Sequence, residues 1–251
     1  DKVMTYNIDI RDDSGELLPQ SEVSEECAKV FARSIQQDEQ ILAHLVAGSK
    51  TSVHAPSRSF LEDEKESIGE NLHILVDAAQ GRFSRSGIRT CLENGWIVMT
   101  TGSKFFGGPP FSSVILFPAK YQLKDKWNDD LRVLFDQAAV FPSQGYPVDS
   151  ERLGPLVRWY AALNEIESYY QIPKKRRFKF LKWFEEDALK LFKDSNLIEV
   201  ITSIPEGIDV SSRLLQSNLT VVTFKLRRNI DSEWCSVEEL RKIHVNLMDE
   251  S

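Results

Sequence analysis

The sequence predicts an α/β fold with a mostly parallel sheet. Three short apolar segments, at residues 41–47, 72–76 and 96–100, are typical of strands that helices cover on both faces. Amphipathic helical patterns lie between them, at about residues 56–70 and 87–93. Such helices supply the right-handed connections that parallel strands need. We therefore expect a three-layer α/β/α domain.

Further elements extend this pattern in both directions. Residues 113–117 form a fourth apolar segment that follows the third through a loop without a helical pattern, so this strand can run antiparallel. Residues 3–10 are also strand-like. Beyond about Asp125, we expect helices at 127–140, 153–170, 173–192 and 237–247, and strands at 197–202 and 219–226. The chain thus divides into a large α/β domain (1–125), bridging helices (126–170) and a smaller α/β domain (171–251).

The composition is that of an acidic globular protein with an ordinary core. Hydrophobic residues make up 41% and charged residues 27%, and the net charge of −7 argues against a general nucleic-acid binder. The longest segment without a charge, residues 105–119, contains two glycines and three prolines and cannot span a bilayer as a helix, so we expect no transmembrane segment and no membrane partner. The three cysteines lie far apart, in no metal or redox spacing. We expect a cytoplasmic protein that binds no metal.

Polar side chains follow each of the three parallel segments. Ser49, Lys50 and Thr51 follow the first, Asp77 and Gln80 the second, and residues 101–104 (Thr-Gly-Ser-Lys) the third. Ligands of open parallel sheets bind beyond the carboxyl ends of the strands, where these groups should meet. A carboxylate there could pair with a ring nitrogen, hydroxyls could bind phosphate, and a lysine could form an imine.

The same segments resemble fold-type I pyridoxal-phosphate enzymes, and most closely the class V aminotransferase and cysteine desulfurase branch. They are residues 49–56 (Ser-Lys-Thr-Ser-Val-His-Ala-Pro), 76–80 (Val-Asp-Ala-Ala-Gln) and 101–109 (Thr-Gly-Ser-Lys-Phe-Phe-Gly-Gly-Pro). The resemblance covers most of residues 40–120 in order and spacing. It implies a fragment that lacks the N-terminal part and the C-terminal end of such an enzyme, and that binds the cofactor poorly by itself.

The resemblance also implies roles for individual residues. Lys104 would hold pyridoxal 5′-phosphate as an internal aldimine and later act as general base. Asp77 would pair with the pyridine nitrogen, and Gln80 would donate a hydrogen bond to the phenolic oxygen of the ring. These three residues are the expected centre of the site.

Hydroxyl groups would complete the cofactor site. By resemblance, Thr101 and Ser103 would bind the phosphate, and Thr51 matches the threonine of a strand-end turn in the family. Ser103 stands where desulfurases have histidine, and Ser49 and Lys50 replace an asparagine and an acid. By resemblance, the replacement at Ser103 would affect the phosphate contact, and those at Ser49 and Lys50 would affect substrate recognition.

We therefore expect a pyridoxal-phosphate-dependent enzyme that acts on an amino acid by amino transfer or as a lyase, assembled as a homodimer by resemblance to the family. Desulfurase activity is disfavoured, because no cysteine lies in a downstream persulfide loop. The alternative is a non-catalytic fragment of the same fold that acts as a binding or assembly module. The basic residues 174–177, followed by aromatic residues, could suggest nucleic-acid or membrane contact, but we interpret them as the polar start of a helix beside its buried face.

The histidines carry weaker signals. His44 and His73 alternate with apolar residues inside predicted strands and should be core residues. His54 lies in the loop after the first strand, where a functional role is open.

Overall fold

The computed structural model describes residues 3–51, 53–82, 84–119, 121, 153–201, 222–231 and 233–249, without the side chains of Glu185, Ala188 and Asp249. The helix predicted at residues 127–140 lies outside the described residues, as does the start of the strand predicted at 219–226.

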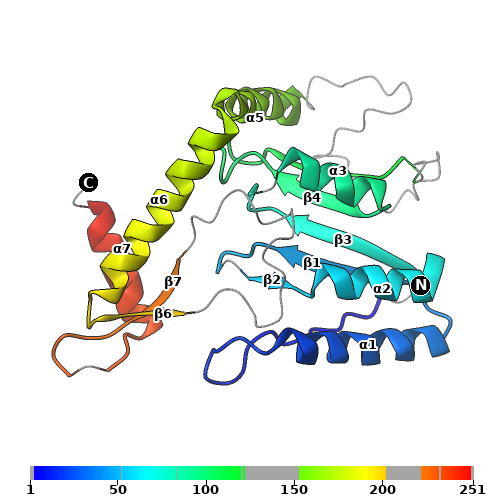
Figure 1. Cartoon of the computed structure of the whole chain (residues 1–251), viewed down its shortest axis with the longest axis horizontal. Helices are drawn as coiled ribbons and strands as arrows, with labels where there is room; N and C mark the ends of the chain where they lie inside the picture. Colours follow the sequence, from blue (N-terminus) through cyan, green and yellow to red (C-terminus); the bar gives the residue numbers. More distant parts are fainter. Residues whose placement is uncertain are drawn as a thin grey trace.

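A five-stranded, mostly parallel sheet forms the first half of the chain, in the order β2-β1-β3-β4-β5 (Figure 1). The central strands β1 (Ile41–Ala47), β3 (Leu72–Ala78) and β4 (Ile97–Thr101) are parallel. The edge strands β2 (His54–Ala55) and β5 (Ser113–Leu116) pair antiparallel with β1 and β4. The mixed α/β fold, the parallel strands and the antiparallel direction of the last strand are therefore confirmed.

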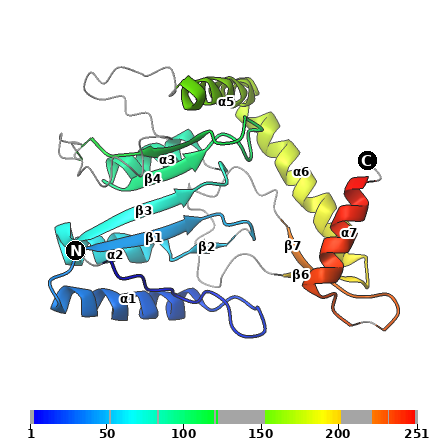
Figure 2. The same cartoon turned by 180° about the vertical axis from the view of Figure 1, so that it is seen from behind.

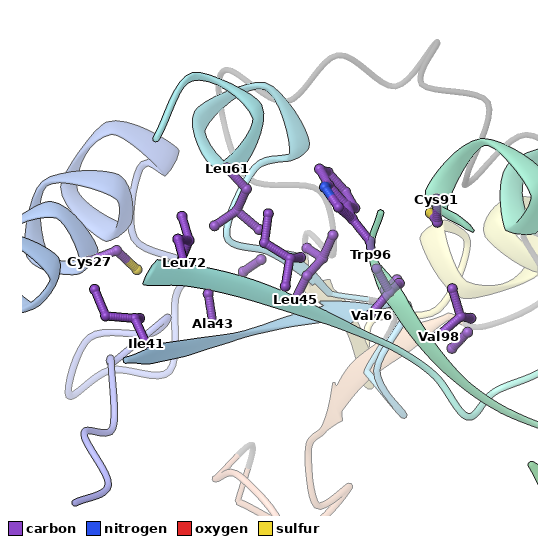
Figure 3. Packing of buried hydrophobic residues seen from close by; sticks show 14 of the residues in the cluster. Cys27, Ile41, Ala43, Leu45, Leu61, Leu72, Val76, Cys91, Trp96 and Val98 are labelled. Atoms are coloured by element: carbon purple, nitrogen blue, oxygen red, sulfur yellow. The ribbon is translucent and has the colours of Figure 1, made fainter. Parts of the chain in front are cut away.

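Three helices cover one face of this sheet: α1 (Gln20–Gln36), α2 (Arg58–Ile68) and α3 (Arg85–Glu93), with a short 3-10 turn η1 (Gly69–Asn71) after α2. Serines cap two of them, because Ser57 Oγ accepts a hydrogen bond from the N–H of Phe60 and Ser84 Oγ accepts one from the N–H of Gly87. Figure 3 shows the core between the helices and the sheet. Its fully buried members include Leu45, Leu61, Leu72, Val76 and Trp96.

Burial alternates along the strands because side chains point to opposite faces. Ile41, Ala43 and Leu45 face the helices and are buried, whereas Leu42 is 60% exposed. Leu75 and Met99, which point away from the helices, are only half-buried. The described helices therefore bury one face of the sheet, and the other stays partly open.

The first forty residues differ from the prediction. Residues 3–10 form no strand: Val3 is 89% exposed, and Ile8 and Ile10 pack on the edge of the core without a partner strand. Helix α1 lies within residues 11–40, where no element was expected. Its buried residues are Gln20, Val23, Cys27, Phe31 and Ser34, which follow a helical period along one side.

The second half is mainly helical. It comprises α5 (Leu153–Gln171), α6 (Lys174–Lys193), the antiparallel strands β6 (Ile198–Ile201) and β7 (Thr223–Leu226), and α7 (Val237–Asp249). In both views, α6 runs from the end of α5 towards β6, β7 and α7 (Figure 1 and Figure 2). These elements agree with the predicted order. Among the described helices, none combines the length and apolarity that crossing a membrane requires.

Candidate functional site at the carboxyl edge of the sheet

The carboxyl ends of the three parallel strands lie at one edge of the sheet. Asp77 pairs with Val46 on β1 and with Met99 on β4, so the three strands end close to the same level. The turns that follow them carry Thr51, Gln80 and Lys104. The structure therefore places the predicted groups at one edge, as the strand order requires.

The turn after β3 packs directly against the loop that holds Lys104. Gly81 ends this turn with a φ of +68°, and its N–H donates to Ala78 O at 2.8 Å. A Cβ atom built on Gly81 would lie 3.0 Å from Thr101 O and 3.6 Å from the Cβ of Phe105. Only glycine combines this conformation with so close an approach. The neighbours of Gln80 and Lys104 in sequence are therefore in contact.

The Lys104 loop has a defined shape. Gly108 N donates to Gly102 O, and Gly102 N donates to Ser112 O, both at 2.9 Å. Ala162 of α5 is fully buried and packs directly on the backbone of this loop. A Cβ atom built on Gly102 would lie 2.5 Å from Ala162 Cβ, and one built on Gly108 would lie 2.8 Å from it. The helix thus fixes the loop through backbone-to-methyl contact.

The side chain of Lys104 is exposed and forms no hydrogen bond or ion pair with any residue in the described part of the chain, whereas its carbonyl oxygen accepts from Gly107 N at 3.2 Å. Its amine therefore stands at the edge of the sheet, on a loop that is itself held in place.

Asp77 lies on the partly open face of the sheet, next to His44. Its Oδ1 atom accepts a hydrogen bond from the N–H of Ala79 at 2.9 Å, which fixes the orientation of the carboxylate. Its Oδ2 atom lies 3.6 Å from Nε2 of His44. By alternation along paired strands, Asp77, Met99 and Thr101 point to the same face. This carboxylate therefore faces the same side as the start of the Lys104 loop.

The hydroxyl groups of Thr101 and Ser103 bond to one another. Thr101 is only 7% exposed, and its Oγ1 donates to Ser112 O at 2.8 Å. Thr101 Oγ1 also accepts a hydrogen bond from Ser103 N at 3.2 Å and lies 2.8 Å from Ser103 Oγ. Because its proton is committed to Ser112, Thr101 shapes the loop, and Ser103 provides the more accessible hydroxyl.

Thr51 and Gln80 complete the set of predicted residues. Thr51 is exposed in the turn between β1 and β2, with its Oγ1 3.1 Å from Ser49 Oγ. Its carbonyl oxygen accepts a hydrogen bond from Thr223 Oγ1 of β7 at 3.1 Å, which ties this turn to the C-terminal strands. The Gln80 side chain is half-buried and bonds to no described residue.

The three strand histidines differ in environment. The prediction that His44 is a core residue is wrong, because its side chain is 51% exposed beside Asp77. His73 is bonded on both ring nitrogens, to Tyr121 Oη at 2.7 Å and Gln40 Oε1 at 3.1 Å. His54 is 3% exposed in β2, and burial, with a smaller effect of Arg58, lowers its pKa to about 4. His54 is therefore a neutral interior residue.

Sequence reasoning also missed a group of aromatic rings beside Lys104, which we call the aromatic cluster: Phe105, Phe106, Tyr169 and Tyr170. Phe105 lies 5.2 Å from Phe106 and 5.2 Å from Tyr169, measured between ring centroids, in edge-to-face arrangements. Tyr169 and Tyr170 end α5, so this cluster joins the helix to the loop. Its two halves are far apart in sequence, and no local pattern predicts that they meet.

Within the described ranges, no three histidine, cysteine, aspartate or glutamate side chains are grouped to hold a metal ion. No protein-family model matches the sequence, and no curated protein matches it significantly.

Proposed function

We propose that this chain carries the lysine-bearing half of a fold-type I pyridoxal-phosphate-dependent enzyme of the class V aminotransferase-like type, acting on an amino acid by amino transfer or as a lyase. The observation that supports it most is the packing of Gly81 against Thr101 O and Phe105. This contact brings the Asp77–Gln80 turn against the Lys104 loop, and the cofactor requires those two segments together.

The groups at this edge fit the chemistry of pyridoxal 5′-phosphate. Asp77 offers a fixed carboxylate for a protonated ring nitrogen, and Gln80 offers an amide that no described residue uses. Ser103 offers a hydroxyl to a phosphate group, and Lys104 offers an amine to an aldehyde. When bound, the cofactor supplies an electron sink for bonds broken at the substrate's α-carbon.

The residues of this chain would do the remaining work. Lys104 would bind the cofactor and then take or return the proton at the substrate's α-carbon, because its side chain is exposed, flexible and unpaired among the described residues. Asp77 would keep the ring nitrogen protonated by its negative charge. The N–H of Ala79 holds that carboxylate in place, and the internal bonds of Thr101 keep the loop that presents Lys104 in shape.

The proposal extends to the architecture. A second helical layer would cover the sheet face that bears His44, Leu75 and Met99, whose partial exposure leaves room for it. The chain would divide into a cofactor domain (1–125), bridging helices (126–170) and a small C-terminal domain (171–251), and two copies would form a homodimer.

Chemical trapping tests this function. The chain is incubated with pyridoxal 5′-phosphate, reduced with borohydride, digested, and its lysine adducts are located by mass spectrometry. We expect modification at Lys104 well above that of other exposed lysines, and none at this position in Lys104→Ala. Lys50→Ala is the matched control, because Lys50 is exposed at the same edge. Adducts spread evenly over exposed lysines would overturn the proposal.

One observation favours the non-catalytic alternative, an assembly module. Helices α5 and α6 expose large apolar side chains, with Tyr160 71%, Phe180 60% and Trp183 55% exposed. The expected buried face of α6 beside residues 174–177 is therefore largely open in this structure. The alternative predicts no preference for Lys104 in the trapping experiment, together with self-association by sedimentation that an Lys104→Ala change leaves untouched.

A further inference from the structure

Three arginines stack on the aromatic cluster beside Lys104. The guanidinium carbon of Arg82 lies 5.2 Å from the ring centroid of Phe105. That of Arg85 lies 4.2 Å from Tyr170, and that of Arg177 lies 4.7 Å from both Tyr169 and Tyr170. These arginines come from the turn after β3, the start of α3 and the start of α6, so the fold gathers them from three separate elements.

Contact with an aromatic ring leaves hydrogen-bonding capacity on the guanidinium groups. The attraction comes from the positive charge over the ring, and a guanidinium has five N–H donors, more than this contact can use. Arg177 uses Nε to donate to Ile172 O at 2.9 Å. The side chain of Arg85 forms no hydrogen bond in the described part of the chain. Both arginines therefore keep donors for another acceptor.

No carboxylate among the described residues forms an ion pair with Arg85 or Arg177. What distinguishes them from exposed arginines without an acidic partner, such as Arg89 and Arg176, is that both lie over the same aromatic ring. Arg85 and Arg177 contact the same ring of Tyr170, so two positive charges lie close together and repel each other. A bound anion would relieve that repulsion.

Tyr170 does not provide the missing negative charge. Burial raises the pKa of Tyr170, although Arg177 and Arg85 act in the opposite direction. The phenol therefore stays protonated at neutral pH. Burial also lowers the pKa of Arg82, since that guanidinium is partly withdrawn from water. The cluster thus holds net positive charge next to an apolar surface.

We infer that Arg85 and Arg177, with Arg82 beside them, bind the oxyanion of a ligand, a carboxylate or a phosphate, next to the Lys104 loop. Planar guanidinium groups match both anions through paired N–H donors. Phe105 and Phe106 directly follow Lys104, and Arg82 directly follows Gly81, which packs on Phe105. Assigning this anion to a ligand that reacts with Lys104 rests on the proposed function. The arginines would then select a substrate or cofactor that carries a negative group at this position.

Arginine footprinting tests the inference without any need for activity. The chain is treated with phenylglyoxal in the presence of succinate, inorganic phosphate or chloride at equal ionic strength, and modified arginines are mapped by mass spectrometry. We expect succinate or phosphate, but not chloride, to protect Arg85 and Arg177 in a saturable manner. Arg89 on α3 and Arg176 on α6 are exposed neighbours and serve as internal controls that stay reactive. Equal protection of all four arginines, or none, would overturn the inference.

Variants separate binding from a purely structural role. Arg85→Gln and Arg177→Gln should each weaken binding of the protecting anion by about tenfold in calorimetry, the effect of losing one charge-assisted contact. Arg89→Gln and Arg176→Gln should leave it unchanged. A variant that lowers the melting temperature while the wild-type chain shows no saturable anion binding would assign the cluster to packing alone and overturn the inference.

The source of the anion and the proposed function remain distinguishable. Each anion is added in turn to the trapping experiment at Lys104. If only phosphate lowers the yield of the trapped adduct, the arginines bind the cofactor's phosphate. If only succinate lowers it, they bind a substrate carboxylate. Lys104→Ala should retain anion protection. If Lys104 is trapped selectively but no arginine is protected, only the anion site fails. If the arginines are protected but trapping is not selective, only the proposed function fails.

Discussion

The imidazole of His44 and the carboxylate of Asp77 face each other across two neighbouring strands, with Nε2 3.6 Å from Oδ2. The separation is slightly longer than a hydrogen bond, so the two polar groups are close neighbours without a direct hydrogen bond in this structure. The two side chains share the partly open face of the sheet, where His44 is 51% and Asp77 25% exposed. His44 is therefore placed to orient the carboxylate that would meet the cofactor ring.

Replacing His44 tests this positioning role. His44→Ala should reduce the yield of the trapped Lys104 adduct several-fold, because the loss of one polar contact would weaken cofactor binding by about 1 kcal/mol. The free energy of unfolding should change little, because the side chain is half exposed. His73→Ala is the control: it removes a strand histidine bonded to Tyr121 and Gln40, and should lower stability without a specific effect on trapping. Equal trapping in wild type and His44→Ala would contradict this role.

Gly81→Ala should separate the two turns of the site. The new methyl group must adopt a φ of +68° and would lie 3.0 Å from Thr101 O, so we expect a loss of about 3 kcal/mol in urea unfolding. Gly48→Ala is a matched control, because its φ is +76° and nothing lies within 4 Å of its Cβ. It should lose only about 1 kcal/mol, from the backbone conformation. A similar loss of unfolding free energy in both variants would show that the contact of Gly81 with the Lys104 loop does not contribute to stability.

A double-mutant cycle tests the contact between α5 and the Lys104 loop. Gly102→Ala places a methyl group 2.5 Å from Ala162 Cβ and should destabilise the chain by about 2 kcal/mol through overpacking. Ala162→Gly should rescue much of this loss. Gly108→Ala should be rescued less well, since its Cβ also meets Gly102 O at 2.8 Å. Additive effects in the first pair would rule out direct packing.

His54 predicts a pH dependence of stability. The pKa of this histidine is about 4 in the folded chain against an ordinary value of 6.5, so the unfolded chain binds the proton more readily. Stability is complete above about pH 6.5 and falls as the pH drops towards 4, by about 2 kcal/mol at pH 5. Urea midpoints at pH 7 and pH 5 measure this fall, and His54→Gln should show a smaller one. An unchanged pH dependence in this variant would contradict the assignment.

The sequence predicted the central sheet because continuous apolar segments of strand length are hard to place elsewhere than in a buried parallel sheet. Strand order then brings the ends of β1, β3 and β4 together, which is why Asp77, Gln80 and Lys104 could be assigned to one edge. The prediction of a strand at residues 3–10 is wrong because an alternating pattern forms a strand only beside a partner strand, and no strand in the described part of the chain pairs with these residues.

Other features depend on contacts between distant segments. His44 was expected in the core because both faces of the sheet were expected to be covered. The described helices cover only one face, so every second residue of a strand, His44 among them, is exposed instead of buried. The aromatic cluster unites residues 105–106 with 169–170, and its arginines come from three elements. Amphipathic periodicity could have identified α1, since Val23, Cys27 and Phe31 recur every four residues.

The close approach of Ala162 to Gly102 and Gly108 gives the C-terminal half of the chain a direct part in holding the Lys104 loop of the N-terminal half. A protein truncated before residue 153 would keep strands β1 to β5 and the helices that cover them, yet lose the methyl group that packs against this loop. Dividing the chain into separately expressed halves should therefore yield a folded sheet in which the loop after β4 has lost its shape.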